Sequence, residues 1–228
     1  MPPPPAKLEL VLVRHGESVG NREGRMQGHR DYPLSPRGRE QARELAAFFR
    51  QRGVSFSSAY TSPLSRAKET AQILCANLEL PPAVEDADLK EITAGCLEGL
   101  DHSQIVERHP TFMQRGLEGL GDFSEFGGES YDDMQARVER LCAGLYARHD
   151  GQGERLLLVS HGGLLFQLAK HLISVPVPRV SILRYGNCTA SLIRMRERRG
   201  TWLGELVWHV PLELYGTDPH RDVGALFR

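Results

Sequence analysis

Four groups of charged or imidazole side chains fall where strands are expected to end or helices to begin. They are Arg14 with His15, then Arg66, Glu91 and His161. Transfer of a phosphoryl group spreads negative charge over its equatorial oxygens, so a protein must supply positive donors, a nucleophile in line and an acid for the leaving oxygen. These residue types meet each need, and the sequence therefore predicts a site for phosphate-ester chemistry.

The chemistry of each side chain suggests its role. A neutral His15 can attack phosphorus and form a phosphohistidine, which divides a hard hydrolysis into two easier steps. Arg14 and Arg66 can clamp phosphate oxygens bidentately, with His161 as a further donor. Glu91, if burial lets it keep its proton, can protonate the departing alkoxide and then activate water.

Taken singly, the same residues also have ordinary interpretations. Arg14 could be a surface cap and His15 a satisfied histidine of the core, while Arg66 could form a surface ion pair with Glu69. The ligand crevice of an open α/β sheet lies beyond the carboxyl ends of its parallel strands. Because the residues share this placement, we favour the catalytic interpretation.

Four segments carry these residues in chain order and at compatible spacing. They are RHGES with Asn21 at 14–21, TSPLSRAKETA at 61–71, LKE at 89–91 continuing through Gly95 to Glu98 and Gly99, and SHGG at 160–163. Together they resemble the phosphoglycerate mutase-like branch of the histidine phosphatase superfamily, over about residues 8–191.

The resemblance implies a role for particular residues of this chain. His15 would be the phosphorylated nucleophile and Glu91 the proton donor. The phosphate would be bound by four residues, which are Arg14, Asn21, Arg66 and His161. Gln27 and Gly28 resemble part of the family's loop beside the pocket and would contact phosphate or substrate. The resemblance implies neither a metal nor an organic cofactor.

The predicted elements alternate between strands and helices. Apolar, β-branched runs predict strands near 8–13, 57–61 and 156–160, and helical spacing predicts helices that begin near Ser35, Ser62, Ser130 and His161. A proline follows the first two of these serines at the first turn, and Ser130 forms a capping box with Asp133. The alternation predicts an α/β fold, a three-layer sandwich with a mainly parallel central sheet and helices on both faces.

Two stretches depart from this alternation. Residues near 189–195 and 203–209 are expected to be paired strands joined through 196–201, where the basic cluster RMRERR would form a solvated edge. Residues from about 93 to 129 are expected to form an inserted cover over the active site, with short helices and the aromatic residues Phe112, Phe123 and Phe126. We treat 1–228 as a single domain in which residues 1–6 form a disordered tail.

The overall composition excludes several classes of partner. With 28 basic and 29 acidic residues the net charge is −1, which does not indicate nucleic acid or an anionic membrane. The four cysteines are scattered without a C-x-x-C pair, which favours a reducing cytosol over a disulfide scaffold or a thiolate zinc site. Without an 18-residue apolar span or a secretory signal pattern, we expect a cytoplasmic protein acting on a small phosphorylated substrate. The sequence carries no signal of an oligomeric state.

Two other site motifs fail on order or spacing. Residues 16–20 match the G-x-S-x-G nucleophile elbow around Ser18, with His161 as the start of an oxyanion loop. In α/β-hydrolases that loop precedes the nucleophile and several strands come before the serine, which is not the order of this chain. His102 and His109 lie seven residues apart without the carboxylates that usually accompany a metal site.

Two alternatives would use the same fold. A non-catalytic module that binds a phosphorylated ligand would be favoured by loss of His15 or Glu91, and both are present. A phosphoglycerate mutase would share every catalytic residue, but the resemblance implies that mutases carry a longer insertion that closes over a bisphosphorylated ligand. Only 70 positions separate Glu91 from His161. We therefore expect a phosphomonoesterase, with the mutase as the alternative.

Overall fold

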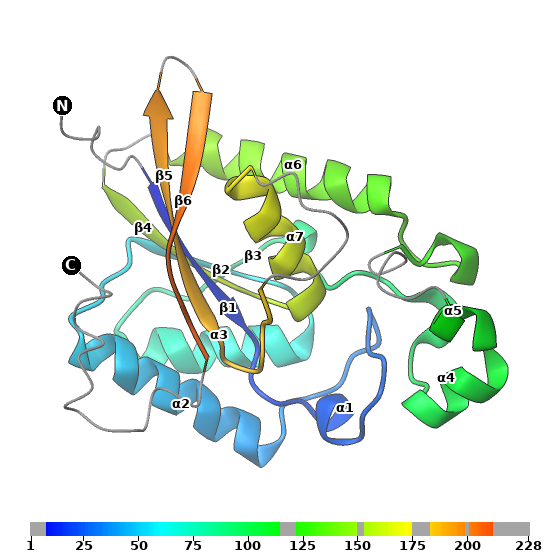
Figure 1. Cartoon of the computed structure of the whole chain (residues 1–228). Coiled ribbons are helices and arrows are strands. Elements are labelled where there is room, and N and C mark those ends of the chain that lie inside the picture. The colour runs from blue at the N-terminus through cyan, green and yellow to red at the C-terminus, as the bar shows by residue number, and fades with distance from the viewer. Residues whose placement is uncertain (1–7, 115–121, 150–152, 175–182, 199–200, 212–228) are drawn as a thin grey trace.

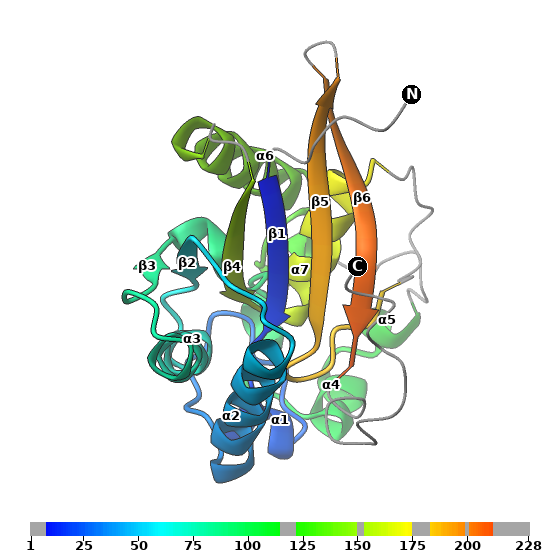
Figure 2. The ribbon, with the colours of Figure 1, turned by 90° about the vertical axis from the view of Figure 1, so that its left-hand side faces the viewer.

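Six strands form one central sheet, in the order β3-β2-β4-β1-β5-β6. The computed structural model describes residues 8–114, 122–149, 153–174, 183–198 and 201–211. Helices cover both faces of the sheet (Figure 1 and Figure 2). The predicted three-layer α/β architecture is confirmed, while the expected tail at 1–6 lies outside the described residues.

The sheet is parallel over most of its width. The four parallel strands are β1 (Leu8–Arg14), β2 (Ser58–Thr61), β3 (Val84–Glu85) and β4 (Glu154–Ser160). The last two strands, β5 (Ala190–Arg198) and β6 (Thr201–Val210), are antiparallel to their neighbours. Arg14 pairs in register with Ser160, so the carboxyl ends of β1 and β4 meet at one edge of the sheet.

Strand β1 divides the apolar core into two layers because its side chains alternate between the faces of the sheet. Val11 and Val13 belong to one buried cluster, and Leu10 and Leu12 belong to the other. All four side chains are fully buried. A strand buried on both faces is apolar at consecutive positions, as this one is.

The long helices are divided between the two faces of the sheet (Figure 2). Helices α2 (Pro36–Gln51) and α3 (Ser65–Asn77) pack on one face, and α6 (Tyr131–Arg148) and α7 (Gly162–Leu172) pack on the other. The predicted caps of two helices are confirmed. Ser35 Oγ accepts a hydrogen bond from Gly38 N, and Ser130 forms the capping box with Asp133.

The short elements gather beyond the carboxyl end of β1 (Figure 1). They are α1 (Val19–Arg22), α4 (His102–Arg108), α5 (Pro110–Gln114) and the 3₁₀ turns Ala87–Leu89, Gly95–Leu97 and Ser124–Phe126. The short helices expected within 93–129 are therefore present. Phe112 stacks on Phe123 and meets Phe126 edge to face, over a small buried cluster with Leu97.

The structure corrects the expected turn at 196–201. Strand β5 continues through Arg198 and β6 begins at Thr201, so the basic cluster lies largely on a strand. Arg194 Nε lies 2.9 Å from Glu9 Oε1, and Arg196 Nη2 lies 3.7 Å from Glu205 Oε2. These ion pairs and the antiparallel ladder extend the hairpin where the local composition suggested a turn.

Across the described ranges, no helix combines the length and the apolar character needed to cross a membrane.

Shortening a side chain of the central strand should destabilise the fold. Leu12 is fully buried on β1, so Leu12→Ala should lower the free energy of unfolding by about 2–5 kcal/mol, because it removes apolar contacts and leaves a cavity. Urea unfolding followed by circular dichroism measures the change. The control is Leu203→Ala on β6, whose side chain is 47% exposed and whose loss should cost about 0.5 kcal/mol or less. Equal effects of the two variants would contradict the described burial.

Candidate active site

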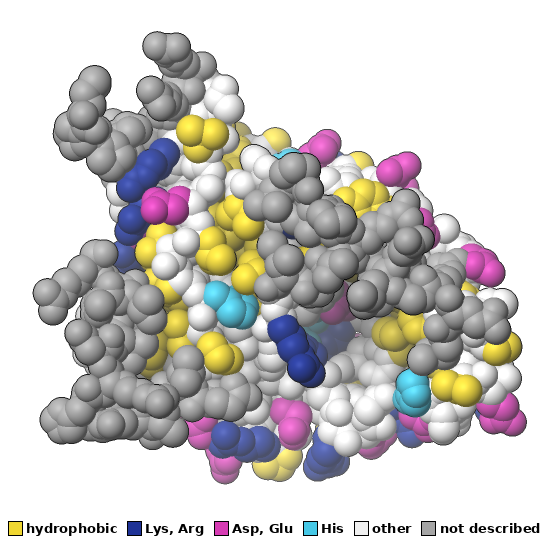
Figure 3. All heavy atoms as spheres, in the orientation of Figure 1, with side chains coloured by type: hydrophobic (Ala, Val, Ile, Leu, Met, Phe, Trp, Pro, Cys, Tyr) yellow, Lys and Arg dark blue, Asp and Glu magenta, His cyan; other side chains and the backbone are white. Residues whose placement is uncertain are grey.

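The carboxyl ends of β1, β2 and β4 bring together His15, Ser62 and His161, which follow these strands by one residue. All three side chains are buried. The ring centroids of His15 and His161 lie 5.1 Å apart. Figure 3 shows a hollow in one face of the molecule in which histidine, basic and acidic side chains are visible. The edge of the sheet thus forms a candidate active site.

His15 is oriented with one ring nitrogen available for attack. Its Nδ1 donates to the carbonyl oxygen of Gly16 at 2.7 Å, which leaves the lone pair on Nε2. Burial and then the charges of Arg14 and Arg66 lower the pKa of His15 well below its ordinary value, while the Gly16 carbonyl raises it. The imidazole is therefore neutral at pH 7, the form that a nucleophile requires.

A close backbone contact fixes the segment that carries His15. Gly16 N donates to Thr70 Oγ1 at 3.0 Å. A Cβ atom added to Gly16 would lie only 2.4 Å from the carbonyl oxygen of Gly38, in the first turn of α2. Only glycine permits this approach, so α2 and α3 together hold the residue that follows the nucleophile.

Arg14 and Arg66 donate to main-chain carbonyls. Arg14 Nη1 donates to Tyr185 O at 2.6 Å, and Arg66 donates to Gly28 O at 2.8 Å and Arg30 O at 3.0 Å. Arg66 is only 1% exposed. Burial lowers the pKa of both guanidinium groups, although arginine stays charged in proteins.

Three buried donors around His15 have no hydrogen-bond partner among the described residues. They are Arg14 Nε, Arg66 Nε and His161 Nδ1, which carries the proton in the tautomer whose Nε2 accepts from Ser62 Oγ. A buried donor left unpaired is costly, so a group of them points to a ligand rich in acceptors. The ordinary interpretation of Arg66 as a surface partner of Glu69 is wrong, because Glu69 pairs with Arg39 instead.

His161 is the N-cap residue of α7, and its imidazole contacts Ser62, which was predicted to cap α3. Its Nε2 lies 2.8 Å from Ser62 Oγ, and burial followed by the charges of His15, Arg66, Arg14 and His29 lowers its pKa well below the ordinary value. Ser62 was expected to cap α3, but the helix begins at Ser65 with Leu64 at the N-cap position.

The cap of α3 comes instead from a distant loop. Asp31 Oδ1 accepts hydrogen bonds from Ser65 N at 2.9 Å and Ser65 Oγ at 2.8 Å. No local sequence pattern reports such a cap, because the carboxylate lies 34 residues earlier. The Ser62 hydroxyl is thereby left to contact His161.

Glu91 lies at the N-terminus of α7. Its carboxylate accepts hydrogen bonds from Leu164 N at 3.0 Å, Gly163 N at 3.1 Å and Ile92 N at 2.9 Å. It was expected to be desolvated, and its side chain is in fact only partly buried. The amide donors fix the orientation of the carboxylate beside His161.

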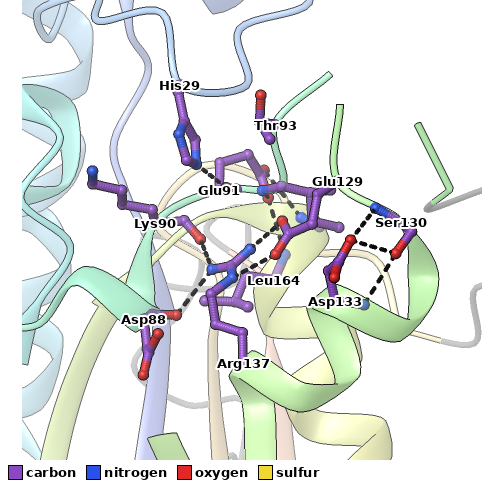
Figure 4. A network of polar contacts seen from close by, with 12 residues as sticks. His29, Asp88, Lys90, Glu91, Thr93, Glu129, Ser130, Asp133, Arg137 and Leu164 are labelled. Carbon is purple, nitrogen blue, oxygen red and sulfur yellow. Dashed lines mark hydrogen bonds and ion pairs between the residues drawn. The ribbon is translucent and has the colours of Figure 1, made fainter. Parts of the chain in front are cut away.

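Arg137 on α6 holds the segment that carries Glu91 (Figure 4). Its guanidinium donates to Lys90 O at 2.7 Å and Asp88 O at 3.0 Å, and it pairs with Glu129 at 2.6 Å. Arg137 belongs to none of the motifs that predict the site from the sequence. Its signal is a charged side chain one position before Val138, on the buried face of an amphipathic helix.

Glu98 connects two segments by hydrogen bonds. One is the loop whose carbonyls bind Arg66, and the other is the stretch that follows Glu91. One carboxylate oxygen accepts from His29 N at 2.9 Å, Thr93 Oγ1 at 2.8 Å and Ala94 N at 3.0 Å. Gly28 next to it has a φ of +50°, and a Cβ there would lie 2.1 Å from the same oxygen.

The other predicted contacts lie around the site in supporting positions. Asn21 Oδ1 and Gln27 Oε1 both lie within 3.0 Å of Ser18 Oγ, which also accepts from Asn21 N to cap α1. Gly28 contributes its carbonyl to Arg66. Ser18 is fully buried within these contacts, in agreement with its rejection as a nucleophile.

The histidines considered as metal ligands are not part of a metal-binding group. His109 packs edge to face on Phe126 and its Nε2 lies 4.0 Å from Cys96 Sγ. Within the part of the chain that the structure describes, no three His, Cys, Asp or Glu side chains are grouped to hold a metal ion.

Residues 10–205 match the family model of the histidine phosphatase superfamily, branch 1. The chain belongs to this superfamily, and the predicted resemblance is confirmed. Among curated relatives, a probable phosphoglycerate mutase, GpmB of Salmonella paratyphi A, is 33% identical over 219 residues, which cover 96% of this chain and 97% of the relative.

Two solved structures extend the comparison. A mycobacterial glucosyl-3-phosphoglycerate phosphatase in complex with VO3 is 32% identical, with a TM-score of 0.76 over 89% of this chain and 99% of that one. A putative alpha-ribazole-5'-P phosphatase from Escherichia coli K-12 is 29% identical, with a TM-score of 0.73 over 87% and 94% of the two chains. The expected class of enzyme, a phosphatase of the histidine phosphatase type, agrees with these neighbours.

Acid should destabilise the folded protein through His15 and His161. Both folded-state pKa values lie well below the ordinary value, so the unfolded chain takes up protons first as the pH falls. The stability they contribute is fully present above about pH 6.5 and is lost as the pH falls toward the folded-state values. The loss is about 1 kcal/mol per histidine between about pH 6.5 and 5.5. Urea unfolding at both pH values measures it. In His161→Gln the loss of unfolding free energy should be smaller by about 1 kcal/mol, the contribution of one histidine. An unchanged loss would contradict the lowered pKa of His161.

Removing the carboxylate of Glu98 should impair catalysis although Glu98 touches none of the predicted catalytic side chains. In Glu98→Ala the loop at Gly28 loses its tie to Thr93 and Ala94, so Arg66 shifts and kcat/KM for a phosphomonoester should fall about tenfold to a hundredfold. Glu98→Gln keeps an acceptor oxygen and should recover part of the activity. The control is Glu107→Ala on the exposed side of α4, and an equal fall there would refute the positioning role.

Proposed function

We propose that the protein hydrolyses a small phosphomonoester through a covalent phosphohistidine on His15. The observation that carries this proposal is the group of buried donors on Arg14, Arg66 and His161, unpaired among the described residues, around a neutral imidazole whose Nε2 keeps its lone pair for attack. Donors arranged in advance around a transferring phosphoryl group stabilise the charge that develops on its oxygens. Asn21, Gln27 and Gly28 stay proposed contacts of the phosphate or the substrate, from the loops beside the same site.

In the first step His15 Nε2 attacks phosphorus and the bond from phosphorus to the ester oxygen breaks. Arg14, Arg66 and His161 hold the equatorial oxygens, and Glu91 gives a proton to the departing alkoxide. In the second step water attacks the phosphohistidine, Glu91 takes up the proton of that water, and the N–P bond breaks. The products are an alcohol and inorganic phosphate, and His15 returns to its neutral form.

A phosphoglycerate mutase is the second candidate, because the curated relatives carry that name. The phosphatase is favoured by the structural neighbours described as phosphatases and by the short stretch between Glu91 and His161. We propose that residues 93–129 act as a cover within a single cytoplasmic domain, 1–228, and select the substrate. The reaction needs no metal. A module that only binds phosphorylated ligands is disfavoured, because the nucleophile and the acid are both present.

Activity should depend on His15 and not on a metal. A phosphate-release panel of phosphomonoesters should show turnover by the wild type with a chelator present, and His15→Ala should lower kcat by about 10⁴-fold or more. Glu91→Gln should lower kcat by about a hundredfold to ten-thousandfold, because the leaving oxygen loses its acid. The matched control is Glu107→Gln. Activity that survives His15→Ala or disappears with chelator rules out the mechanism, and steady exchange of phosphate between positions of phosphoglycerate without net release identifies the mutase.

A further inference from the structure

Arg184 directly precedes Tyr185, whose carbonyl binds Arg14, on a backbone that is fixed from two sides. The carbonyl oxygen of Arg184 accepts from His209 Nε2 on β6 at 3.2 Å. The carbonyl oxygen of the next residue, Tyr185, accepts from Arg14 Nη1 at 2.6 Å. The buried Tyr185 ring also meets His209 edge to face, with ring centroids 5.2 Å apart. The main chain at Arg184 is therefore tied directly to the arginine that is proposed to hold phosphate.

The side chain of Arg184 is exposed and has no carboxylate partner among the residues that the structure describes. Two arginines of β5 differ in this respect, since Arg194 pairs with Glu9 and Arg196 approaches Glu205. An arginine with a free planar fork of donors is suited to bind a carboxylate or a phosphate bidentately.

The charge of Arg184 acts on Arg14. Burial is the main cause that lowers the pKa of Arg14, and the charge of Arg184 lowers it further, whereas Glu91 and Cys188 raise it. The two guanidinium groups repel each other, and an anion that both can approach would offset this repulsion. Arg14 is partly buried and Arg184 is exposed, so the two arginines form a path of positive charge from the site to the surface.

The phosphate itself does not need Arg184. The buried unpaired donors of Arg14, Arg66 and His161 already supply the phosphoryl oxygens with partners. We propose that Arg184 forms a second subsite at the entrance, which binds an additional anionic group of the substrate. The preferred substrates are then phosphomonoesters that carry a second negative charge, rather than esters of neutral alcohols. This inference rests on the proposed function, because it places the second group relative to a phosphate held at His15.

The test uses p-nitrophenyl phosphate as the substrate and a matched pair of competing ligands. The two compounds are 3-phosphoglycerate, which carries a carboxylate, and glycerol 3-phosphate, which carries a hydroxymethyl group at the same position. Their inhibition constants are measured with the wild type, Arg184→Gln and Arg50→Gln. The last variant removes the same charge from an exposed arginine near the far end of α2. The ratio of the two constants within each protein cancels any general change in activity or in folded fraction.

In the wild type, 3-phosphoglycerate should bind at least about tenfold more tightly than glycerol 3-phosphate, since an ionised hydrogen-bond pair is worth about this much. The ratio should fall about tenfold in Arg184→Gln and stay unchanged in Arg50→Gln. Equal inhibition by the two compounds in the wild type overturns the subsite, and so does an unchanged ratio in Arg184→Gln. Failure of the proposed function is seen separately, as hydrolysis of p-nitrophenyl phosphate that is absent or that survives His15→Ala.

Discussion

One buried and one partly buried guanidinium group lie beside an imidazole whose pKa is held low, and the rest of the site depends on how this positive charge is accommodated. Arg14 and Arg66 donate to main-chain carbonyls, which satisfy N–H groups without cancelling a charge. Asp31 lies 3.9 Å from Arg66 and is itself 51% exposed, so it offsets little. The positive potential is thus retained for a ligand. Together with burial, the same potential keeps His15 and His161 neutral.

The parallel sheet turns separation along the chain into proximity at one edge. His15 and His161 follow neighbouring strands in register, although 146 positions separate them in the sequence. Glu91 reaches the site in another way. No strand ends at Glu91, and its carboxylate is held by the first amides of the helix that His161 begins. The N-terminus of α7 therefore positions with a single piece of backbone both His161, proposed to donate a hydrogen bond to phosphate, and Glu91, the proposed acid.

The sequence predicts those features that local chemistry controls and misses those that arise from packing between distant segments. The buried strand β1 and the caps at Ser35 and Ser130 depend on neighbouring residues, and they are as expected. Ser62 has the same Ser-Pro pattern as Ser35, yet its hydroxyl contacts a histidine 99 positions later. Arg137 also binds carbonyls far from it in sequence. The roles assigned to the site residues remain predictions, supported by the geometry that brings them together.

The 93–129 segment has an apolar cluster of its own, separate from the two layers on the sheet. Phe112 and Phe123 pack against buried Leu97 and Phe126, and none of the four belongs to the clusters built on β1. Changes in this cluster can reshape the segment without altering the packing that holds His15. The apolar cluster and the catalytic edge are linked instead through polar side chains, because Glu98 binds the loop beside Arg66 and Glu129 binds Arg137. Sequence changes at Phe112 or Phe123 would therefore leave these polar ties in place.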